Sequence, residues 1–217
     1  MVDLRLNEKI VLVTGADDSL GTVICEKLVK NGAKVWSHQF SENTAGSNQH
    51  YVNTTTIISK LDSREEVRTV VNKIIAEDKK IDILINLAEK KDSFTIDQLT
   101  PQTWLAAFQR NLDTPFLCCQ EILPAMIEHG SGTIINITSQ AAFTGDIGPH
   151  YAASKSALNS FTKGLAREFK EKGIKVKEVC VPVKLHDQSL PLKSRRHMIE
   201  AVANKTLLAC SAYLDEE

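Results

Sequence analysis

The sequence predicts an α/β protein in which a doubly wound parallel sheet lies between two layers of helices. Six short runs of aliphatic and β-branched residues are near-continuous in hydrophobicity, as strands buried on both faces are. Helical patterns lie between these runs, and alternation of strand and helix is typical of a parallel sheet. The chain has 217 residues, of which 42% are hydrophobic, which suits a single domain over residues 1–217.

The six strands are expected in chain order at residues 9–14, 34–38, 55–60, 81–86, 132–138 and 174–181. The stretch 41–50 is polar and rich in Ser, Asn and Gly, so it is expected to be a surface loop. No internal repeat is visible in the sequence.

Two helices are expected in the first half of the chain. The first covers residues 19–31 and ends before Gly32, a residue type that favours helix ends because it adopts positive φ easily. The second covers residues 63–78 and opens with a capping box, in which Ser63 caps the helix and Glu66 binds back.

Three further helices are expected in the second half. One begins after the cap residue Thr100 with Pro101 in its first position and runs toward residue 129. Pro115 and Pro124 lie inside it and are expected to bend or divide it, because proline lacks the N–H that a helix interior uses. The other two helices are expected at residues 151–172 and 197–213.

Composition excludes several classes of function. The net charge of −1 offers no basic field for nucleic acid or an anionic membrane, and the apolar runs are too short to span a bilayer. Charged residues interrupt the N-terminus, so no signal peptide is expected. The five cysteines lack C-x-x-C spacing and are odd in number, which favours reduced thiols in a cytoplasmic protein. The six histidines lack ligand spacing, so no metal site is expected.

A glycine turn, T-G-A-D-D-S-L-G-T at residues 14–22, joins the first strand to the first helix. Backbone N–H groups and a helix N-terminus meet in such a turn, and together they bind a pyrophosphate. Gly15 would allow the tight turn, and Gly21 would allow close approach of the backbone. A plain strand-to-helix loop is the alternative, but the position at the first strand favours a nucleotide.

A second motif places Tyr151 and Lys155 four residues apart in a helical segment, so both lie on one face. A surface helix with an extended lysine is the structural alternative. Ser139 directly follows the fifth expected strand, and ligands of open α/β sheets bind at the carboxyl ends of strands. Ser139 and the start of the Tyr151 helix are therefore expected to meet at that edge.

Asn111, Ser139, Tyr151 and Lys155, in this order downstream of T-G-x-x-x-x-x-G, resemble the catalytic tetrad of the short-chain dehydrogenase/reductase family. The resemblance covers residues 7–182 and is strongest to members of the 3-oxoacyl carrier-protein reductase type. It implies a Rossmann-type fold. It also implies an oxidoreductase that moves a hydride between NAD or NADP and a small ketone or secondary alcohol.

The residue roles follow from this chemistry. Tyr151 would be the general acid or base, and Lys155 as a neighbouring cation would lower the pKa of the phenol. Ser139 would stabilise negative charge on the carbonyl oxygen. By resemblance, Lys155 also binds the nicotinamide ribose, and Asn111 holds a water that passes protons to Lys155.

The resemblance places the cofactor contacts on the glycine turn and on the ends of later strands. They are Gly15, Asp18, Ser19, Leu20, Gly21, Gln39, Leu61, Asn86, Ala88, Tyr151, Lys155 and Pro182. Gln39 stands where an NAD enzyme has an acid, and a basic residue for a 2′-phosphate is absent too. Because the charge of Asp18 would repel such a phosphate, the sequence leans slightly to NAD.

Several positions depart from the family pattern. Ser19 replaces the middle glycine of the turn, and Leu87 and Glu89 replace two residues of the family's N-N-A-G motif. Lys60 stands where an acid is usual, and Val183 replaces a glycine. These changes predict weaker cofactor binding. The segment covering the substrate, residues 183–197, is short, and the family's seventh strand is missing, which predicts an open pocket.

Two other hypotheses stay open. One is a scaffold or binding protein of the same fold whose cofactor binding is impaired. The other is a phosphate-binding regulatory domain of unrelated fold, which requires a different strand order. The resemblance also implies a homo-oligomer paired through the helices at 100–129 and 151–172, with a dimer expected over a tetramer.

Overall fold

The computed structural model describes residues 6–40 and 53–211, whose strands form one parallel six-stranded sheet in the order β3-β2-β1-β4-β5-β6. The strands are β1 (Ile10–Thr14), β2 (Lys34–Gln39), β3 (Thr54–Ile58), β4 (Ile83–Asn86), β5 (Gly132–Ser139) and β6 (Ile174–Val181). The order reverses between β1 and β4, so the predicted doubly wound, Rossmann-type fold is confirmed and an unrelated fold is excluded. The expected loop at 41–50 lies outside the described residues.

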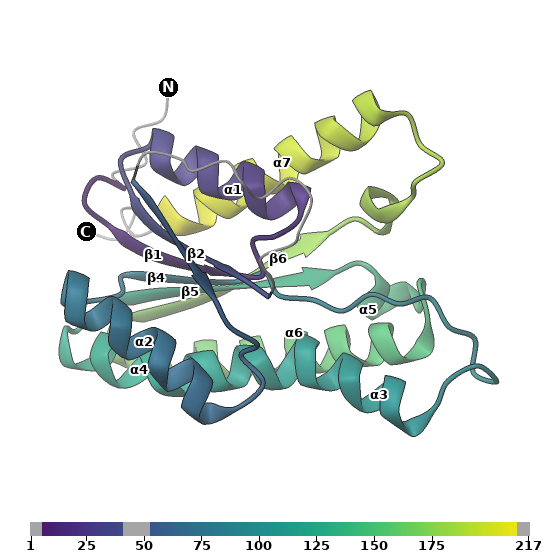
Figure 1. The fold of residues 1–217 in the computed structure, drawn as a ribbon, viewed down its shortest axis with the longest axis horizontal. Helices are drawn as coiled ribbons and strands as arrows, with labels where there is room; N and C mark the ends of the chain where they lie inside the picture. The colour runs from purple at the N-terminus through teal and green to yellow at the C-terminus, as the bar shows by residue number, and fades with distance from the viewer. Residues whose placement is uncertain (1–5, 41–52, 212–217) are drawn as a thin grey trace.

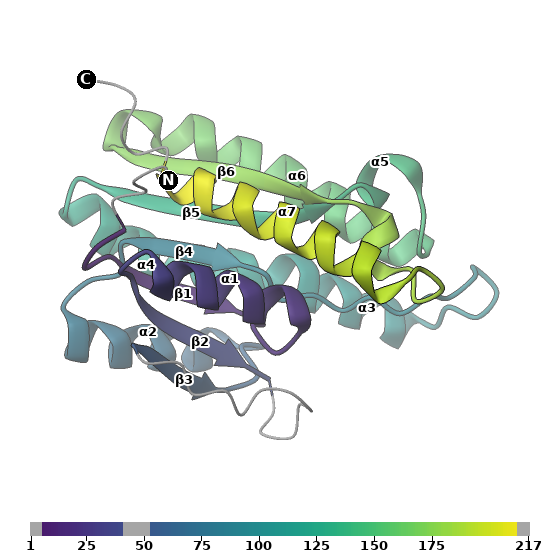
Figure 2. The same cartoon turned by 90° about the horizontal axis from the view of Figure 1, so that it is seen from above.

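The helices form two layers over this sheet. They are α1 (Ser19–Lys30), α2 (Arg64–Asp78), α3 (Pro101–Phe108), a π-helical turn (Gln109–Asp113), α4 (Thr114–Glu128), α5 (Ala141–Thr144), α6 (Pro149–Phe169), two 3₁₀ turns (Lys170–Lys172 and Val183–His186) and α7 (Leu192–Ser211). Helices α1 and α7 lie side by side on one face, and α2, α4 and α6 cover the other (Figures 1 and 2).

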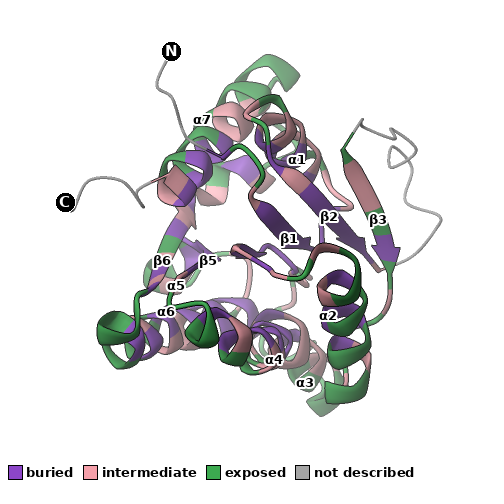
Figure 3. Cartoon of the chain, turned by 90° about the vertical axis from the view of Figure 1, so that its left-hand side faces the viewer, coloured by how far each residue is buried: buried purple, intermediate pink, exposed green. Residues whose placement is uncertain are grey.

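Each face of the sheet has its own hydrophobic core, because successive side chains of a strand point to opposite faces. Val11 and Val13 of β1 pack toward α1, while Leu12 between them packs toward α2 and α4. Ile24 of α1 and Ile122 of α4 lie on opposite faces of the sheet, and both are fully buried. Burial of each such aliphatic side chain contributes roughly 2 kcal/mol to stability. Figure 3 shows β1 and β2 largely buried between helices whose outer surfaces are exposed, while the edge strand β3 is only partly buried.

The helix expected from Thr100 to residue 129 is divided, but at one proline only. Thr100 caps α3, and a π-helical turn then separates α3 from α4. Pro115 follows this turn and has no N–H for the backbone carbonyl four residues earlier, so the helix widens there. Pro124 lies within α4, which continues through it, so the helix is not divided at Pro124.

Other boundaries shift by a few residues. Helix α6 begins at Pro149, two residues before the predicted start, and α7 begins at Leu192, five residues early. The four-residue α5 was not predicted. Among the described residues, β6 is the last strand, and only residues 182–191 separate it from α7.

Within residues 6–40 and 53–211, no helix combines the length and the apolar character that crossing a membrane requires. The same residues contain no group of three or more Asp, Glu, His or Cys side chains placed to hold a metal ion.

Candidate active site

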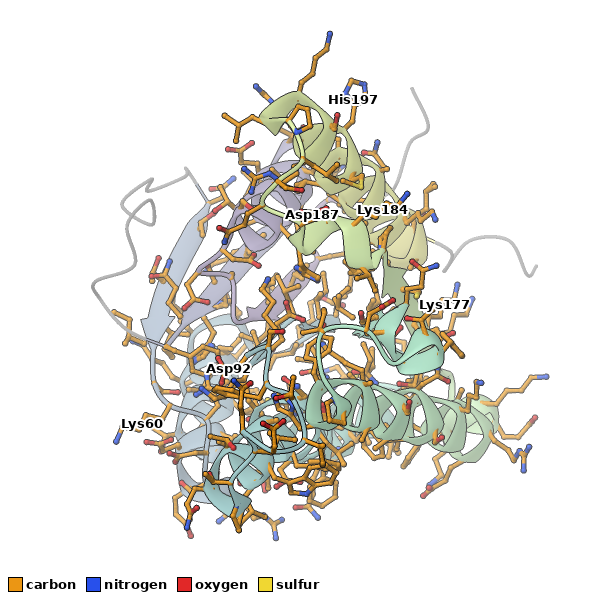
Figure 4. All side chains as sticks on the ribbon, turned by 90° about the vertical axis from the view of Figure 1, so that its right-hand side faces the viewer. Lys60, Asp92, Lys177, Lys184, Asp187 and His197 are labelled. Carbon is orange, nitrogen blue, oxygen red and sulfur yellow. The ribbon has the colours of Figure 1, made fainter. Side chains whose placement is uncertain are left out.

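The carboxyl ends of β1, β4 and β5 lie side by side at one edge of the sheet. The register places Thr14 of β1 opposite Asn86 of β4, and Asn86 opposite Asn136 of β5. Figure 4 faces this edge, with Asp92 on the segment after β4 and Lys184 on the segment after β6 in view. All four tetrad residues are fully buried.

The glycine turn after β1 requires glycine at both predicted positions. Gly15 has φ +66°, and a Cβ there would lie 2.5 Å from the Cα of Ala88. A Cβ on Gly21 would lie 2.5 Å from the Cα of Ala16. The N–H of Gly15 donates to Nδ1 of His38 at 3.2 Å, which ties the turn to β2.

Asp18 caps α1, because its Oδ1 accepts a 2.8 Å hydrogen bond from the N–H of Gly21. Burial raises the pKa of Asp18, and the hydrogen bond from Gly21 opposes that rise. A carboxylate therefore lies at the helix N-terminus where an anionic ligand would bind. Ser19 is the first residue of α1, and the side chain of Leu20 packs into the core instead of facing the turn.

Tyr151 and Lys155 lie side by side on α6, as predicted, and share one carboxylate. The Tyr151 hydroxyl donates to Oε2 of Glu89 at 3.0 Å, and Nζ of Lys155 lies 3.2 Å from the same oxygen. Nζ of Lys155 also donates to the backbone carbonyl of Ile137 at 3.0 Å. Glu89 follows β4, so the departure from the family's glycine lies inside the predicted site.

This arrangement changes the proton affinity of the phenol. Burial raises the pKa of Tyr151 well above its ordinary value, and the charge of Glu89 raises it further, while a hydrogen bond with Ser139 opposes the rise. The pKa of Tyr151 is therefore raised overall, whereas the sequence analysis expected it to be lowered, because burial and the charge of Glu89 dominate it. The ammonium of Lys155 is itself paired with Glu89.

The polar contacts continue from Glu89 to the segment after β6. Nζ of Lys91 lies 3.0 Å from Oε1 of Glu89 and donates to Nδ1 of His186 at 3.0 Å. An ammonium is only a donor, so Nδ1 of His186 accepts and the ring proton lies on Nε2. Burial lowers the pKa of His186 to about 4, so the ring is neutral near pH 7.

Ser139 and Asn111 lie where the sequence predicted them and have defined partners. The Ser139 hydroxyl accepts a 3.2 Å hydrogen bond from the N–H of Ala141, the first residue of α5. The Asn111 side chain accepts from the N–H of Lys90 at 2.7 Å and donates to the carbonyl of Lys90 and to the Ser154 hydroxyl. Asn111 therefore anchors the segment that carries Glu89 against α6.

The remaining predicted cofactor residues occupy two different environments. Gln39 is the last residue of β2, Leu61 and Ala88 lie in the segments after β3 and β4, and all three are buried. Pro182 follows β6 directly. Asn86 instead donates from its side-chain amide to Oδ1 of Asn136 at 2.8 Å, so its side chain stabilises the sheet interior. Lys60 is exposed.

Two contacts near the end of β2 were not predicted from the sequence. The ring of His38 accepts from Gly15 and is 2.9 Å from the carbonyl of Ser59, so it links the turn to the chain after β3. The Arg110 guanidinium lies 3.3 Å from the ring centroid of Phe40. No short-range signal predicts either contact, because the partners are more than twenty residues apart in the chain.

Comparison with known proteins agrees with this geometry. The model of the short chain dehydrogenase family matches residues 9–187. The chain is 34% identical over 180 residues to the 3-oxoacyl-(acyl-carrier-protein) reductase FabG of Escherichia coli K12, covering 82% of this chain and 74% of that protein. It is 30% identical over 176 residues to an acetoacetyl-CoA reductase of an Acinetobacter species, covering 74% of this chain and 68% of that protein.

Solved structures show the same fold. A short-chain dehydrogenase/reductase from Burkholderia xenovorans aligns with a TM-score of 0.85 and 24% identity over 95% of this chain and 90% of that one. A gluconate 5-dehydrogenase from Burkholderia cenocepacia, in complex with NADP and tartrate, aligns with a TM-score of 0.81 and 21% identity over 98% of this chain and 92% of that one. The family match, the identity to the two reductases and the strand order together show that this chain is an oxidoreductase of the short-chain dehydrogenase family.

Proposed function

We propose that this oxidoreductase interconverts a small-molecule ketone and a secondary alcohol, with Tyr151 as general acid and base. The observation that supports this most is the placement of the Tyr151 hydroxyl and the Lys155 ammonium. Both residues lie on one face of α6 at the carboxyl edge of the sheet, and the Tyr151 hydroxyl is within hydrogen-bond reach of Ser139. A nicotinamide cofactor supplies the hydride when bound.

The proton inventory assigns each residue a role. In reduction, Tyr151 gives its phenolic proton to the oxygen that was the carbonyl, and in oxidation it takes that proton back. The Ser139 hydroxyl donates to the same oxygen and stabilises its negative charge. Lys155 stabilises the phenolate once Tyr151 has lost its proton. Asn111 holds the loop after β4 in place, and its water-mediated proton transfer stays a prediction.

The glycine turn fits a dinucleotide in one respect and opposes it in another. Gly15 and Gly21 allow close backbone packing against Ala88 and Ala16, which any larger residue would prevent, and the turn built this way leads into the N-terminus of α1, where a phosphate is favoured. The Asp18 carboxylate already binds the N–H of Gly21 there and adds negative charge. The negative charge of Asp18 favours NAD over NADP, because NADP carries an additional phosphate.

A second candidate function is a binding protein of this fold with impaired cofactor binding. Two contacts favour it: Glu89 neutralises Lys155, and Asp18 occupies the N-terminus of α1. Titration of the purified protein with NADH and with NADPH by calorimetry separates the two candidates. Micromolar affinity for either cofactor supports the enzyme, and no binding at millimolar concentration by a folded protein contradicts it.

The catalytic assignment has its own test. A protein that binds cofactor is screened against ketones that include 3-oxoacyl thioesters, since two relatives are named as reductases of such compounds. We expect Tyr151→Phe to lower turnover by at least roughly 100-fold while cofactor affinity changes little, because the hydroxyl alone supplies the proton. Unchanged turnover in Tyr151→Phe would refute the mechanism.

We also propose that the chain forms a homodimer through α4 and α6 and is cytoplasmic. Phe116 on α4 is 42% exposed and packs edge-on against Phe161 of α6, which places exposed aromatic surface across both helices. The described cysteines are all free, which supports a reducing compartment.

A further inference from the structure

Glu89 is a charged residue that the proposed mechanism does not use, although it contacts both principal residues of that mechanism. Its side chain is only 15% exposed, and it lies within 3.2 Å of the Tyr151 hydroxyl, the Lys155 ammonium and the Lys91 ammonium. Lys155 is 1% exposed, so this ion pair is largely shielded from solvent. The family pattern has glycine here, which carries no charge.

Glu89 is ionised near neutral pH. Burial by itself raises the pKa of the carboxyl, but Lys155 and Lys91 outweigh burial and bring the pKa to about 2. The other charged groups near it are Asp18 and the Lys91 ammonium, while His186 is neutral near pH 7. A fixed negative charge therefore lies beside the pair that faces the reacting atoms.

We propose that Glu89 makes this site select the oxidised nicotinamide over the reduced form. The inference rests on the proposed function. The oxidised ring carries a positive charge and the reduced ring is neutral, while the rest of the cofactor is identical. A carboxylate that contacts Tyr151 and Lys155 is close to any ring that reacts at this pair. Its attraction acts on the oxidised form alone, and the low exposure of the cluster limits screening.

The experiment measures the ratio of the two dissociation constants, reduced over oxidised, by calorimetry on the full chain. NAD⁺ and NADH are the probes, or NADP⁺ and NADPH if only those bind. We expect Glu89→Gln to lower this ratio at least roughly tenfold, the effect of one charge about 12 Å away at an effective dielectric of about 20, and a ring closer to Glu89 gives a larger change. Glu89→Asp retains the charge and should stay near the wild-type ratio.

Two further variants separate local charge from loop damage. Lys91→Gln removes a cation that offsets Glu89, so the ratio should rise, opposite to the effect of Glu89→Gln. Lys91 is 37% exposed and is expected to tolerate the change, which keeps the test valid if Glu89→Gln fails to fold. Asp92→Asn removes the same charge as Glu89→Gln from an exposed position in the same loop and should leave the ratio nearly unchanged.

The outcomes distinguish this inference from the proposed function. If neither form of either cofactor binds the wild type or the variants, the proposed function fails and this inference fails with it. If both forms bind, but Glu89→Gln and Lys91→Gln leave the ratio unchanged or shift it in the same direction, this inference alone is overturned. Opposite shifts, with Asp92→Asn unchanged, support it.

Discussion

Tyr151 is buried and has a carboxylate as its hydrogen-bond acceptor, and both features raise its pKa. Phenolate and carboxylate 3.0 Å apart would repel, so Glu89 holds Tyr151 in its protonated form. We expect Glu89→Gln to lower the pKa of Tyr151 in the protein without ligands, because the substitution removes the negative charge beside the phenol. Tyrosinate absorbance during an alkaline titration measures it, and Tyr151→Phe identifies its signal among the three tyrosines of the chain. An unchanged titration in Glu89→Gln would contradict the prediction.

Two constraints favour glycine at position 15: its positive φ and the backbone of Ala88 close to it. Two substitutions measure these constraints separately. Gly130 has a similar φ of +67°, but a Cβ added there would have nothing within 4 Å, so Gly130→Ala reports the backbone cost alone, about 1 kcal/mol. Gly15→Ala adds a collision with the backbone of Ala88 and should cost at least roughly 1–3 kcal/mol more. Urea unfolding measures both. Equal losses would show that the turn can move away from Ala88.

At the level of elements, His38 connects β1, β2 and the chain after β3 through a single buried ring. Nδ1 accepts from Gly15, so Nε2 carries the proton and donates to the carbonyl of Ser59. The pKa of His38 is lowered to about 4, mainly by burial. The positive charge of Arg110 also lowers this pKa, while the hydrogen bond with Ser59 raises it. The ring is therefore bound in its neutral form, and its protonation would break the contact with Gly15.

A pH dependence of stability follows from this depressed pKa. The folded protein takes up the His38 proton only near pH 4, whereas the unfolded chain takes it up near 6.5. The stabilisation is complete above pH 6.5 and is lost as pH falls to about 4, at up to roughly 1.4 kcal/mol per pH unit. We expect His38→Gln to show a correspondingly shallower loss in denaturant unfolding between these pH values. His186 titrates in both proteins, so the difference between them reports His38, and parallel curves would refute the assignment.

For the molecule as a whole, the proposed dimer predicts which surface change disrupts assembly. A charge introduced by Phe116→Asp would be buried in a dimer formed by α4 and α6, and burial of an unpaired charge is costly. We expect the sedimentation coefficient to fall to that of a monomer. Leu208→Asp on α7 is the matched control, since Leu208 is 53% exposed and lies on the opposite face of the sheet. Dissociation by Leu208→Asp alone would place the interface on α7.

Short-range patterns in the sequence were sufficient to predict the six strands, the cap residues and the order of the tetrad. Strands buried on both faces need apolar side chains in consecutive positions, and caps need a side-chain oxygen next to the first free N–H groups. Both requirements fall on neighbouring residues, so Thr100 and Ser63 were identifiable without a structure. Tyr151 and Lys155 were paired correctly for the same reason, since helical geometry fixes residues four apart.

The surroundings of that pair, in contrast, depend on contacts between distant segments. Glu89 is 62 residues from Tyr151 in the chain, and His38 is 23 residues from Gly15. The order of strands in the sheet brings these side chains together, and no local pattern records it. The sequence showed that Glu89 replaces a glycine, but the sign of its effect on Tyr151 and Lys155 depends on distances of about 3 Å. Such distances arise from packing between segments, which is why the charge of the site became known only with the fold.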